Sequence, residues 1–266
     1  MSIDIPARTG LAAASFTLWH KHMRKFLGNG EELFGLMIQP VLWILLFGVG
    51  MRTMVGGAPG AVDGDYIGFM LPGIVALSAM GGAIGGGMVW VDERARGIVR
   101  EYVVAPIPRS AIMLGNISSA TTKALFQALV IFAVGLLMGA GVTANPLGWV
   151  LGFGLLVGYA AGFAAIALAI ASLTDDLMAY HAMIMLLNLP VLFLSNALYP
   201  LASMPGWMKV GALINPTSYL VDGMRQAVLG GTAEIPMWIC VSVIAGFAAL
   251  GLLTATRAFT RKTTRS

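Results

Sequence analysis

The sequence predicts an all-α polytopic membrane protein with six transmembrane helices. Three observations predict it: of 266 residues, 58% are hydrophobic, only 11% are charged, and the apolar residues fall into six long runs. Soluble domains normally carry about a quarter charged residues, so a soluble enzyme is excluded. Because about 20 apolar residues cross a bilayer as a helix, the chain has room for six crossings and no large extramembrane domain.

Residues 1–33 are predicted to form an amphipathic segment. In a helix, one face carries Phe16, Trp19, Met23, Phe26 and Leu27, and the opposite face carries Lys21, Arg24 and Lys25. A helix divided in this way lies in the membrane interface, with its apolar face toward the lipid.

Six apolar runs follow, each bounded by charges, glycine or proline. They predict spans at 34–54, 66–90, 121–141, 147–171, 177–199 and 236–256. Residues 34–256 thus form one transmembrane domain, and residues 257–266 form a basic tail.

The basic residues predict the orientation, because cytoplasmic loops carry an excess of Lys and Arg. Of 16 basic residues, four precede the first run, five lie between residues 94 and 123, and four follow the last run. Only Arg52, Lys209 and Arg225 fall on the other side. Both termini are therefore predicted to be cytoplasmic. Topology explains the net charge of +4, so no nucleic-acid partner is expected.

The cytoplasmic connection at 91–110 is longer than a turn requires. It mixes both charge signs with an apolar stripe, and Pro106 and Pro108 end it. Asp92 and Arg96 have the i, i+4 spacing of a supportive helical ion pair. A short helix is therefore expected here.

The external connection at 200–235 is apolar but is broken by Pro205, Gly206 and Pro216. Irregular backbone at membrane depth must be buried in protein or line water. We therefore expect a re-entrant or interface-lying helical hairpin before the last span.

Glycines at helical spacing indicate close helix packing. Gly154, Gly158 and Gly162 share one face of the fourth span, and Gly135 and Gly139 repeat the spacing in the third. Packing within one bundle is favoured over a dimer seam. The second span carries Gly81, Gly82, Gly85, Gly86 and Gly87, for which a hinge and passive packing are both open.

Several residue patterns that would indicate a particular function are absent from the sequence. No Asp or Glu lies near the middle of a predicted span, which disfavours ion-coupled transport. No phosphate-binding loop precedes a Lys-Ser or Lys-Thr pair, so the chain is not expected to bind or hydrolyse ATP itself. No nucleophile elbow is present, and the lone Cys240 and three histidines form no metal pattern. We therefore expect no catalytic residue, cofactor or metal in this chain.

Uncharged polar residues within the spans either join helices or face a translocation path. The candidates are Gln39, Gln127, Asn188 and Asn196, with Phe193 beside them. His181 is the one titratable candidate in the fifth span, and we interpret it as an interfacial or helix-packing residue.

Three segments resemble the type-2 ATP-binding-cassette exporter permeases. DERARGIVREYVVAPIPRSAIMLGN matches their Glu-Arg-x-x-Gly segment, INPTSYLVDGMRQAVLG their late Asn-Pro-x-x-Tyr segment, and YIGFMLPGIVALSAMGG their second span. Daunorubicin-resistance and nodulation-signal permeases are the most similar in character. The chain departs from the family at Ala95, where many members carry a second acid.

The resemblance implies a bacterial plasma-membrane exporter in which a separate ATPase subunit, in two copies, binds ATP and Mg and docks on a cytoplasmic coupling helix. Its contacts would be Asp92, Glu93, Arg94, Arg96, Gly97, Ile98, Val99, Arg100, Glu101 and Tyr102. Two permease halves, identical or similar, would form one path. An external gate would comprise Asn215, Pro216, Tyr219, Asp222 and Arg225, where Asp222 and Arg225 alternatively form a local ion pair.

Three functions remain open on the sequence. The first is the membrane subunit of an exporter for an amphipathic or hydrophobic compound, such as a drug or a lipid-like molecule. The second is the same machine moving a lipid-linked polysaccharide. The third is a membrane anchor or assembly factor that transports nothing.

Overall fold

The computed structural model describes residues 10–50, 66–143, 145–174, 176–231 and 234–263, and all regular structure in these ranges is helical. The elements are α1 (Leu11–Leu27), α2 (Gly30–Gly50), α3 (Tyr66–Ala95), α4 (Ile98–Val104), α5 (Arg109–Leu137), α6 (Pro146–Leu173), α7 (Leu177–Phe193), the 3-10 turn η2 (Leu201–Ser203), α8 (Gly206–Ile214), α9 (Pro216–Met224), the π-helical turn η3 (Arg225–Leu229) and α10 (Met237–Thr263). The predicted all-α class is confirmed for this part of the chain.

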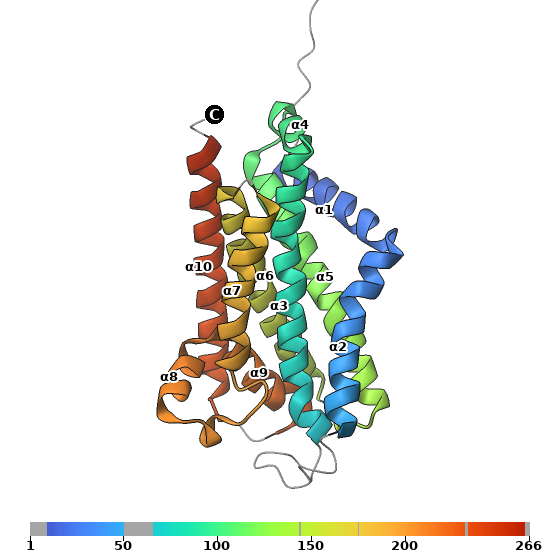
Figure 1. The fold of residues 1–266 in the computed structure, drawn as a ribbon, viewed down its shortest axis with the longest axis vertical. Helices are drawn as coiled ribbons and strands as arrows, with labels where there is room; N and C mark the ends of the chain where they lie inside the picture. Colours follow the sequence, from blue (N-terminus) through green and yellow to red (C-terminus); the bar gives the residue numbers. More distant parts are fainter. Residues whose placement is uncertain (1–9, 51–65, 144, 175, 232–233, 264–266) are drawn as a thin grey trace, which may run out of the picture.

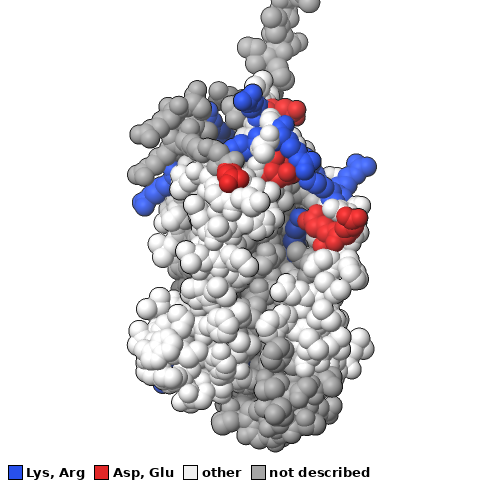
Figure 2. Space-filling model, viewed as in Figure 1, with Lys and Arg blue, Asp and Glu red and all other residues white. Residues whose placement is uncertain are grey.

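Long helices run side by side in an elongated bundle, with α3 in the middle (Figure 1). The helix α1 slants along one side near the end that carries α4, and α8 and α9 lie at the opposite end. Charged side chains gather at the α4 end, while the flank of the bundle is almost free of them (Figure 2). This distribution agrees with the predicted orientation, which stays a prediction because Arg8, Arg52 and Arg265 lie outside the described residues.

Among the residues that the structure describes, four helices are long and apolar enough to cross a membrane: α3, α5, α6 and α10. The helix α7, with 17 residues, is apolar but shorter. The helix α2 begins at Gly30, and the end of its predicted span, 51–54, lies outside the described residues. Four spans are thus supported, and the count of six stays a prediction.

Two helices differ from the spans predicted for them. The helix α5 begins at Arg109, after Pro108 at its N-cap, so it starts before the span predicted from residue 121. The helix α7 ends at Phe193 and not at 199: Pro190 lies in its last turn, and the carbonyls of Val191 and Leu194 accept hydrogen bonds from the Asn215 side chain at 2.8 and 2.6 Å.

Small residues let α3 approach α5 closely. A Cβ atom added to Gly82 would lie 3.3 Å from Ala124 Cα, and one added to Gly86 would lie 2.7 Å from Ala120 Cβ. Gly87 leaves no room for a side chain beside Tyr180 and Ala167. These three glycines are therefore packing residues, and α3 runs through them as one unbroken helix.

The pair α6 and α10 uses the same device. A Cβ atom on Gly158 would lie 2.9 Å from Ile244, and one on Gly162 would lie 2.6 Å from the Phe247 ring. Gly154 has no neighbour within 4 Å in the described structure. Two of the three glycines on this face thus pack within the bundle, as the favoured interpretation predicted.

The helix α1 is amphipathic, but the predicted apolar face is only partly the buried one. Its side facing α5 buries Ala14, Leu18, His22, Met23 and Phe26. Phe16 and Leu27, predicted on the same face, are 64% and 60% exposed. The reason is Gly115 of α5, where an added Cβ would lie 2.7 Å from Leu18 Cβ, so that α1 rests on Leu18. Phe16 and Leu27 remain on the outer side, available to lipid.

The segment between α7 and α10 contains the predicted pair of short helices. All residues of α9 from Thr217 to Met224 are buried, and the helix packs against α3, α6 and α10. The helix α8 lies at the periphery, with Trp207 73% exposed. Since α9 lies inside the bundle, its irregular ends are satisfied by protein, as a re-entrant hairpin requires.

We expect Gly162→Ala to destabilise the protein and Gly154→Ala to leave it unchanged or slightly more stable. A methyl group at 162 would overlap the Phe247 ring, and such overpacking costs about 1–3 kcal/mol. A methyl group at 154 meets open space, and alanine is favoured over glycine in a helix by up to about 1 kcal/mol. Unfolding of the detergent-solubilised variants measures both, and equal effects at the two positions would contradict the packing assignment.

Candidate functional site

The connection between α3 and α5 forms a projecting helix at the charged end. The helix α3 continues to Ala95, and the chain then turns at Gly97, whose φ of 80° lies in the left-handed region that favours glycine. The helix α4 follows, and Arg96 Nε donates to Asp92 Oδ1 at 2.9 Å. The predicted short helix and its i, i+4 pair are both present.

Glu93 is the junction between three helices. Its side chain is 4% exposed and accepts a hydrogen bond from Lys21 Nζ of α1 at 2.9 Å. The Tyr102 hydroxyl of α4 lies 3.1 Å from both carboxylate oxygens, and Lys21 also binds that hydroxyl. His22 Nδ1 lies 4.0 Å from the same carboxylate. Glu93 therefore ties α1 and α4 to the end of α3 instead of facing outward.

The environment of this junction shifts the titration of its members. Burial lowers the pKa of His22 and outweighs the opposite effect of Glu93, so the neutral imidazole is favoured. Burial alone would lower the pKa of Lys21, but the hydrogen bonds to Tyr102 and Glu93 outweigh it and raise the pKa. Burial also raises the pKa of Tyr102. The junction is thus held by the contact of Lys21 with Glu93 and by the Tyr102 hydroxyl, which is bonded to both.

Arg94 makes a second tie, between α3 and α6. Its guanidinium donates to the carbonyl oxygens of Ser172 and Thr174 at 3.1–3.2 Å. These carbonyls end α6, where unpaired acceptors and the negative end of the helix dipole favour a cation. Glu93 and Arg94 together fix the base of α4 to the bundle.

The outer surface of α4 is exposed and carries both charge signs. Arg96, Arg100 and Glu101 are exposed, while Asp92, Gly97, Ile98, Val99 and Tyr102 are partly exposed. A shallow hollow is lined by Arg100, Glu101, Val104 and Ala105. Of the predicted docking set, only Glu93 is fully enclosed.

A cavity of about 700 Å³ lies between α2, α3, α5 and α7. Its lining residues are Gly35, Gln39, Pro40, Trp43, Ile74, Leu77, Ser78, Gly81, Gly82, Met88, Gln127, His181, Asn188, Leu192 and Leu198. Cavities of this size hold drug-sized molecules, typically between about 300 and 1,000 Å³.

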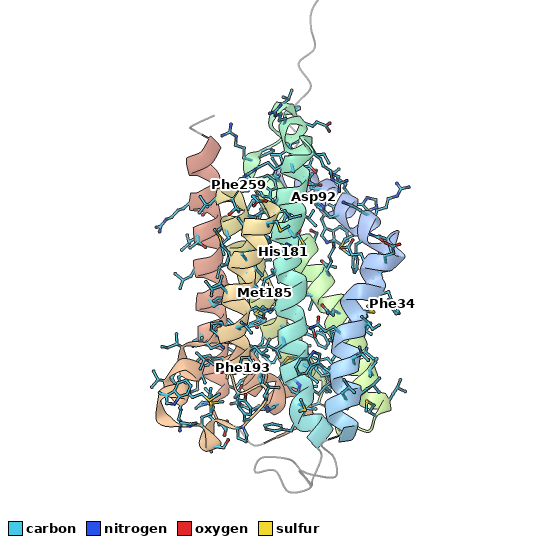
Figure 3. All side chains as sticks on the ribbon, in the orientation of Figure 1. Phe34, Asp92, His181, Met185, Phe193 and Phe259 are labelled. Atoms are coloured by element: carbon cyan, nitrogen blue, oxygen red, sulfur yellow. The ribbon has the colours of Figure 1, made fainter. Side chains whose placement is uncertain are left out.

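Three of the five predicted path residues, Gln39, Gln127 and Asn188, meet in this cavity. Phe193 and Asn196 do not line it. Figure 3 shows Phe193 at the end of α7 away from His181, and Asn196 is fully buried, with its carbonyl bound by Arg225 at 2.9 Å. His181, interpreted from the sequence as a packing residue, lines the cavity and is exposed.

The predicted external gate is a buried hydrogen-bonded cluster. The Asn215 side chain caps α9 by accepting from Thr217 N at 3.0 Å, while its amide holds the end of α7, and Pro216 occupies the first turn. The Tyr219 hydroxyl donates to the Leu213 carbonyl at 2.5 Å, which ties α9 to α8.

Asp222 and Arg225 bind backbone groups and not each other. Asp222 accepts from the amide of Ile235 at 2.7 Å, and Arg225 donates to the carbonyls of Phe69 and Asn196. The guanidinium also lies 3.9 Å from the centre of the Phe69 ring. The local ion pair is therefore not formed. Arg225, counted from the sequence as an external loop charge, is only 6% exposed because it joins α3 to the end of α7.

Sequence reasoning missed three contributors. Lys21 and His22 were assigned to the amphipathic surface helix. Their contact with Glu93 was not predicted because about 70 residues of sequence separate them from it. Ser78 of α3 also lines the cavity. The only sequence signal for this was a polar residue one turn after Ile74, another lining residue, in an otherwise apolar helix.

Comparison with known proteins places this geometry in a family. Residues 14–229 match the model of the ABC-2 type transporter family. The putative transport permease ycf38 of Pyropia yezoensis is 30% identical over 193 residues, covering 71% of this chain and 65% of the relative. The daunorubicin resistance ABC transporter permease protein DrrB1 of Streptomyces coeruleorubidus is 24% identical over 251 residues, covering 92% and 87%. The inner membrane transport permease YadH of Escherichia coli K12 is 22% identical, covering 87% and 88%.

The alignment spans slightly under two thirds, 65%, of the length of the ycf38 permeases. The family match contains α1 from Ala14, the helix α4, the cavity and the α9 cluster. This protein therefore belongs to the ABC-2 type transporter family and is an integral membrane protein.

Proposed function

We propose that this protein is the membrane subunit of an ATP-driven exporter that moves an amphipathic or hydrophobic compound out of the cell. The observation that carries the proposal is α4, an exposed helix of mixed charge whose base is fixed to the bundle by Glu93 and Arg94. Such a helix suits a force-transmitting contact, since a partner reaches its outer surface while its root moves with the bundle.

A separate ATPase subunit, in two copies, would supply ATP and Mg, since the sequence carries no phosphate-binding loop. Arg96, Arg100 and Glu101 offer the polar rim of its docking surface, with Ile98, Val99 and Tyr102 as the less exposed centre. Nucleotide would shift the bundle between inward-facing and outward-facing states only by binding the two states with different affinity.

The cavity would form part of the export path, completed by a second permease half, either identical or similar. Its largely apolar lining and drug-like size suit an amphipathic molecule. The Asn215–Arg225 cluster would close the external end. In a bacterial plasma membrane, both termini and α4 would face the cytoplasm.

Transport is expected only with a cognate ATPase subunit. We expect the purified chain alone to hydrolyse no ATP, and proteoliposomes with both subunits to move an amphipathic fluorescent dye when ATP is added on the α4 side. A proton or sodium gradient imposed on the chain alone serves as the comparison. Gradient-driven dye movement without the ATPase subunit would refute the proposal.

Charge reversal on α4 should break docking. We expect Arg96→Glu combined with Arg100→Glu to lower affinity for the ATPase subunit at least about ten-fold, since two exposed cations become anions. Lys209→Glu, on exposed α8 at the opposite end, is the matched control. Binding is measured by co-purification and by light interferometry, and an unchanged affinity in the double variant would place the dock elsewhere.

Glu93→Gln is expected to loosen α4 without removing its docking surface. Loss of the charge weakens the hydrogen bonds to Lys21 and Tyr102 and should lower the folding stability by about 1–3 kcal/mol. The control Asp92→Asn loses only an exposed ion pair, which contributes less than about 1 kcal/mol. The ATPase subunit should still bind, but more ATP should be hydrolysed per dye molecule moved. An unchanged ratio would mean that Glu93 has no part in coupling.

A further inference from the structure

The cavity carries hydrogen-bonding groups and no permanent charge. Its polar side chains are Gln39, Ser78, Gln127, His181 and Asn188. The other lining residues are apolar or glycine, and no Lys, Arg, Asp or Glu is among the described residues that line it. Three amides, each with donors and an acceptor, thus come from three different helices: α2, α5 and α7.

Three charged residues on or next to these helices bind partners away from the cavity lining. Glu32 of α2 forms an ion pair with Lys123 of α5 at 2.6 Å. Asp176, which precedes α7, accepts hydrogen bonds from the amides of Met178 and Ala179 at 3.1 and 3.3 Å. In Figure 3, His181 lies on α7 below the end that holds Asp92. A molecule in the cavity therefore meets no carboxylate along the described walls.

His181 adds an acceptor. Its Nδ1 lies 3.3 Å from the carbonyl oxygen of Leu177, which only accepts, so this bond requires the proton on Nδ1. In the neutral ring, Nε2 is then an acceptor. The ring carries no negative charge to offset that of a cation.

Energetics favour a neutral occupant. Removing an ion from water is costly even after the protein relaxes, and this cost needs an opposite charge to offset it. A neutral group loses far less solvation, and hydrogen bonds to the amides of the cavity offset that loss.

We propose that this cavity selects an uncharged amphiphile that carries both hydrogen-bond donors and acceptors, and that it discriminates against permanently cationic amphiphiles. The inference rests on the proposed function, because it takes the cavity to be part of the export path. It adds the chemical class of the substrate and names Gln39, Gln127 and Asn188 as the groups that recognise it.

The test compares two probes on the full chain in phosphatidylcholine nanodiscs. One probe is the dansyl amide of decylamine, which is uncharged, and the other carries a trimethylammonium group at the end of the same alkyl chain. Energy transfer from tryptophan to dansyl reports binding, after subtraction of empty nanodiscs. The uncharged probe should bind at least about ten-fold more tightly. Equal affinities, a preference for the cation or no saturable binding of the uncharged probe would overturn the proposal.

Variants locate the selectivity. Asn188→Asp places a carboxylate in the cavity and should improve binding of the cationic probe about ten-fold, while Asn188→Leu should weaken the uncharged probe alone. Met185→Asp puts the same charge one turn earlier on α7, at a site that is 72% exposed and does not line the cavity, and should leave the preference unchanged. If Met185→Asp acted like Asn188→Asp, the cavity assignment would be wrong.

These measurements need neither ATP nor an ATPase subunit, so they separate the two proposals. Selective binding without ATP-driven transport would support the cavity's selectivity and count against the export function. Transport that does not distinguish the two probes would support export and overturn the selectivity.

Discussion

The absence of water inside a bilayer is the constraint on which this structure depends, because the backbone polar groups there must find their partners within the protein. Continuous helices meet it by themselves, and the broken region between α7 and α10 meets it with side chains. Asn215 binds carbonyls at the end of α7, Asp222 binds the amide of Ile235, and Arg225 binds the carbonyl of Phe69. The segment INPTSYLVDGMRQAVLG is thus explained first as structure, because its side chains bind the ends of the broken helices.

The same constraint determines where the charged residues lie and what they contact. Many of the charged residues lie at the α4 end, where Glu93 and Arg94 bind to neighbouring helices and Arg96 and Arg100 remain on the surface. Charged residues that are neighbours in the sequence therefore differ in burial and contacts, since successive residues of a helix point in different directions. Asp222 and Arg225, which are buried inside the bundle near its other end, are held by hydrogen bonds to backbone groups.

The sequence predicted the elements better than their contacts. Apolar runs located the long helices, and the Asp92–Arg96 spacing predicted its ion pair, because both signals are local. The start of α5 at Arg109 was missed because the helix extends beyond its apolar part. The Lys21–Glu93 pair joins distant segments, and no spacing rule reaches across them. Gln39, Gln127 and Asn188 were selected as polar residues in apolar helices, but only the fold shows that they share a cavity from which Asn196 is absent.

The glycines divide the bundle into a tight part and a looser one. Gly86 and Gly162 let α3 meet α5 and α6 meet α10 at distances that exclude any side chain, so these helices move together or not at all. On the other side of α3, Gly81 faces open space and lines the cavity between α2 and α7. The glycine-rich stretch of α3 is therefore better described as the border between a tightly packed side and a loosely packed side of the helix than as a hinge. A force on α4 would reach α3 through Glu93 and would move the tightly packed helices as a unit. The cavity would then change its size, because the distance of α3 from α2 and α7 would change.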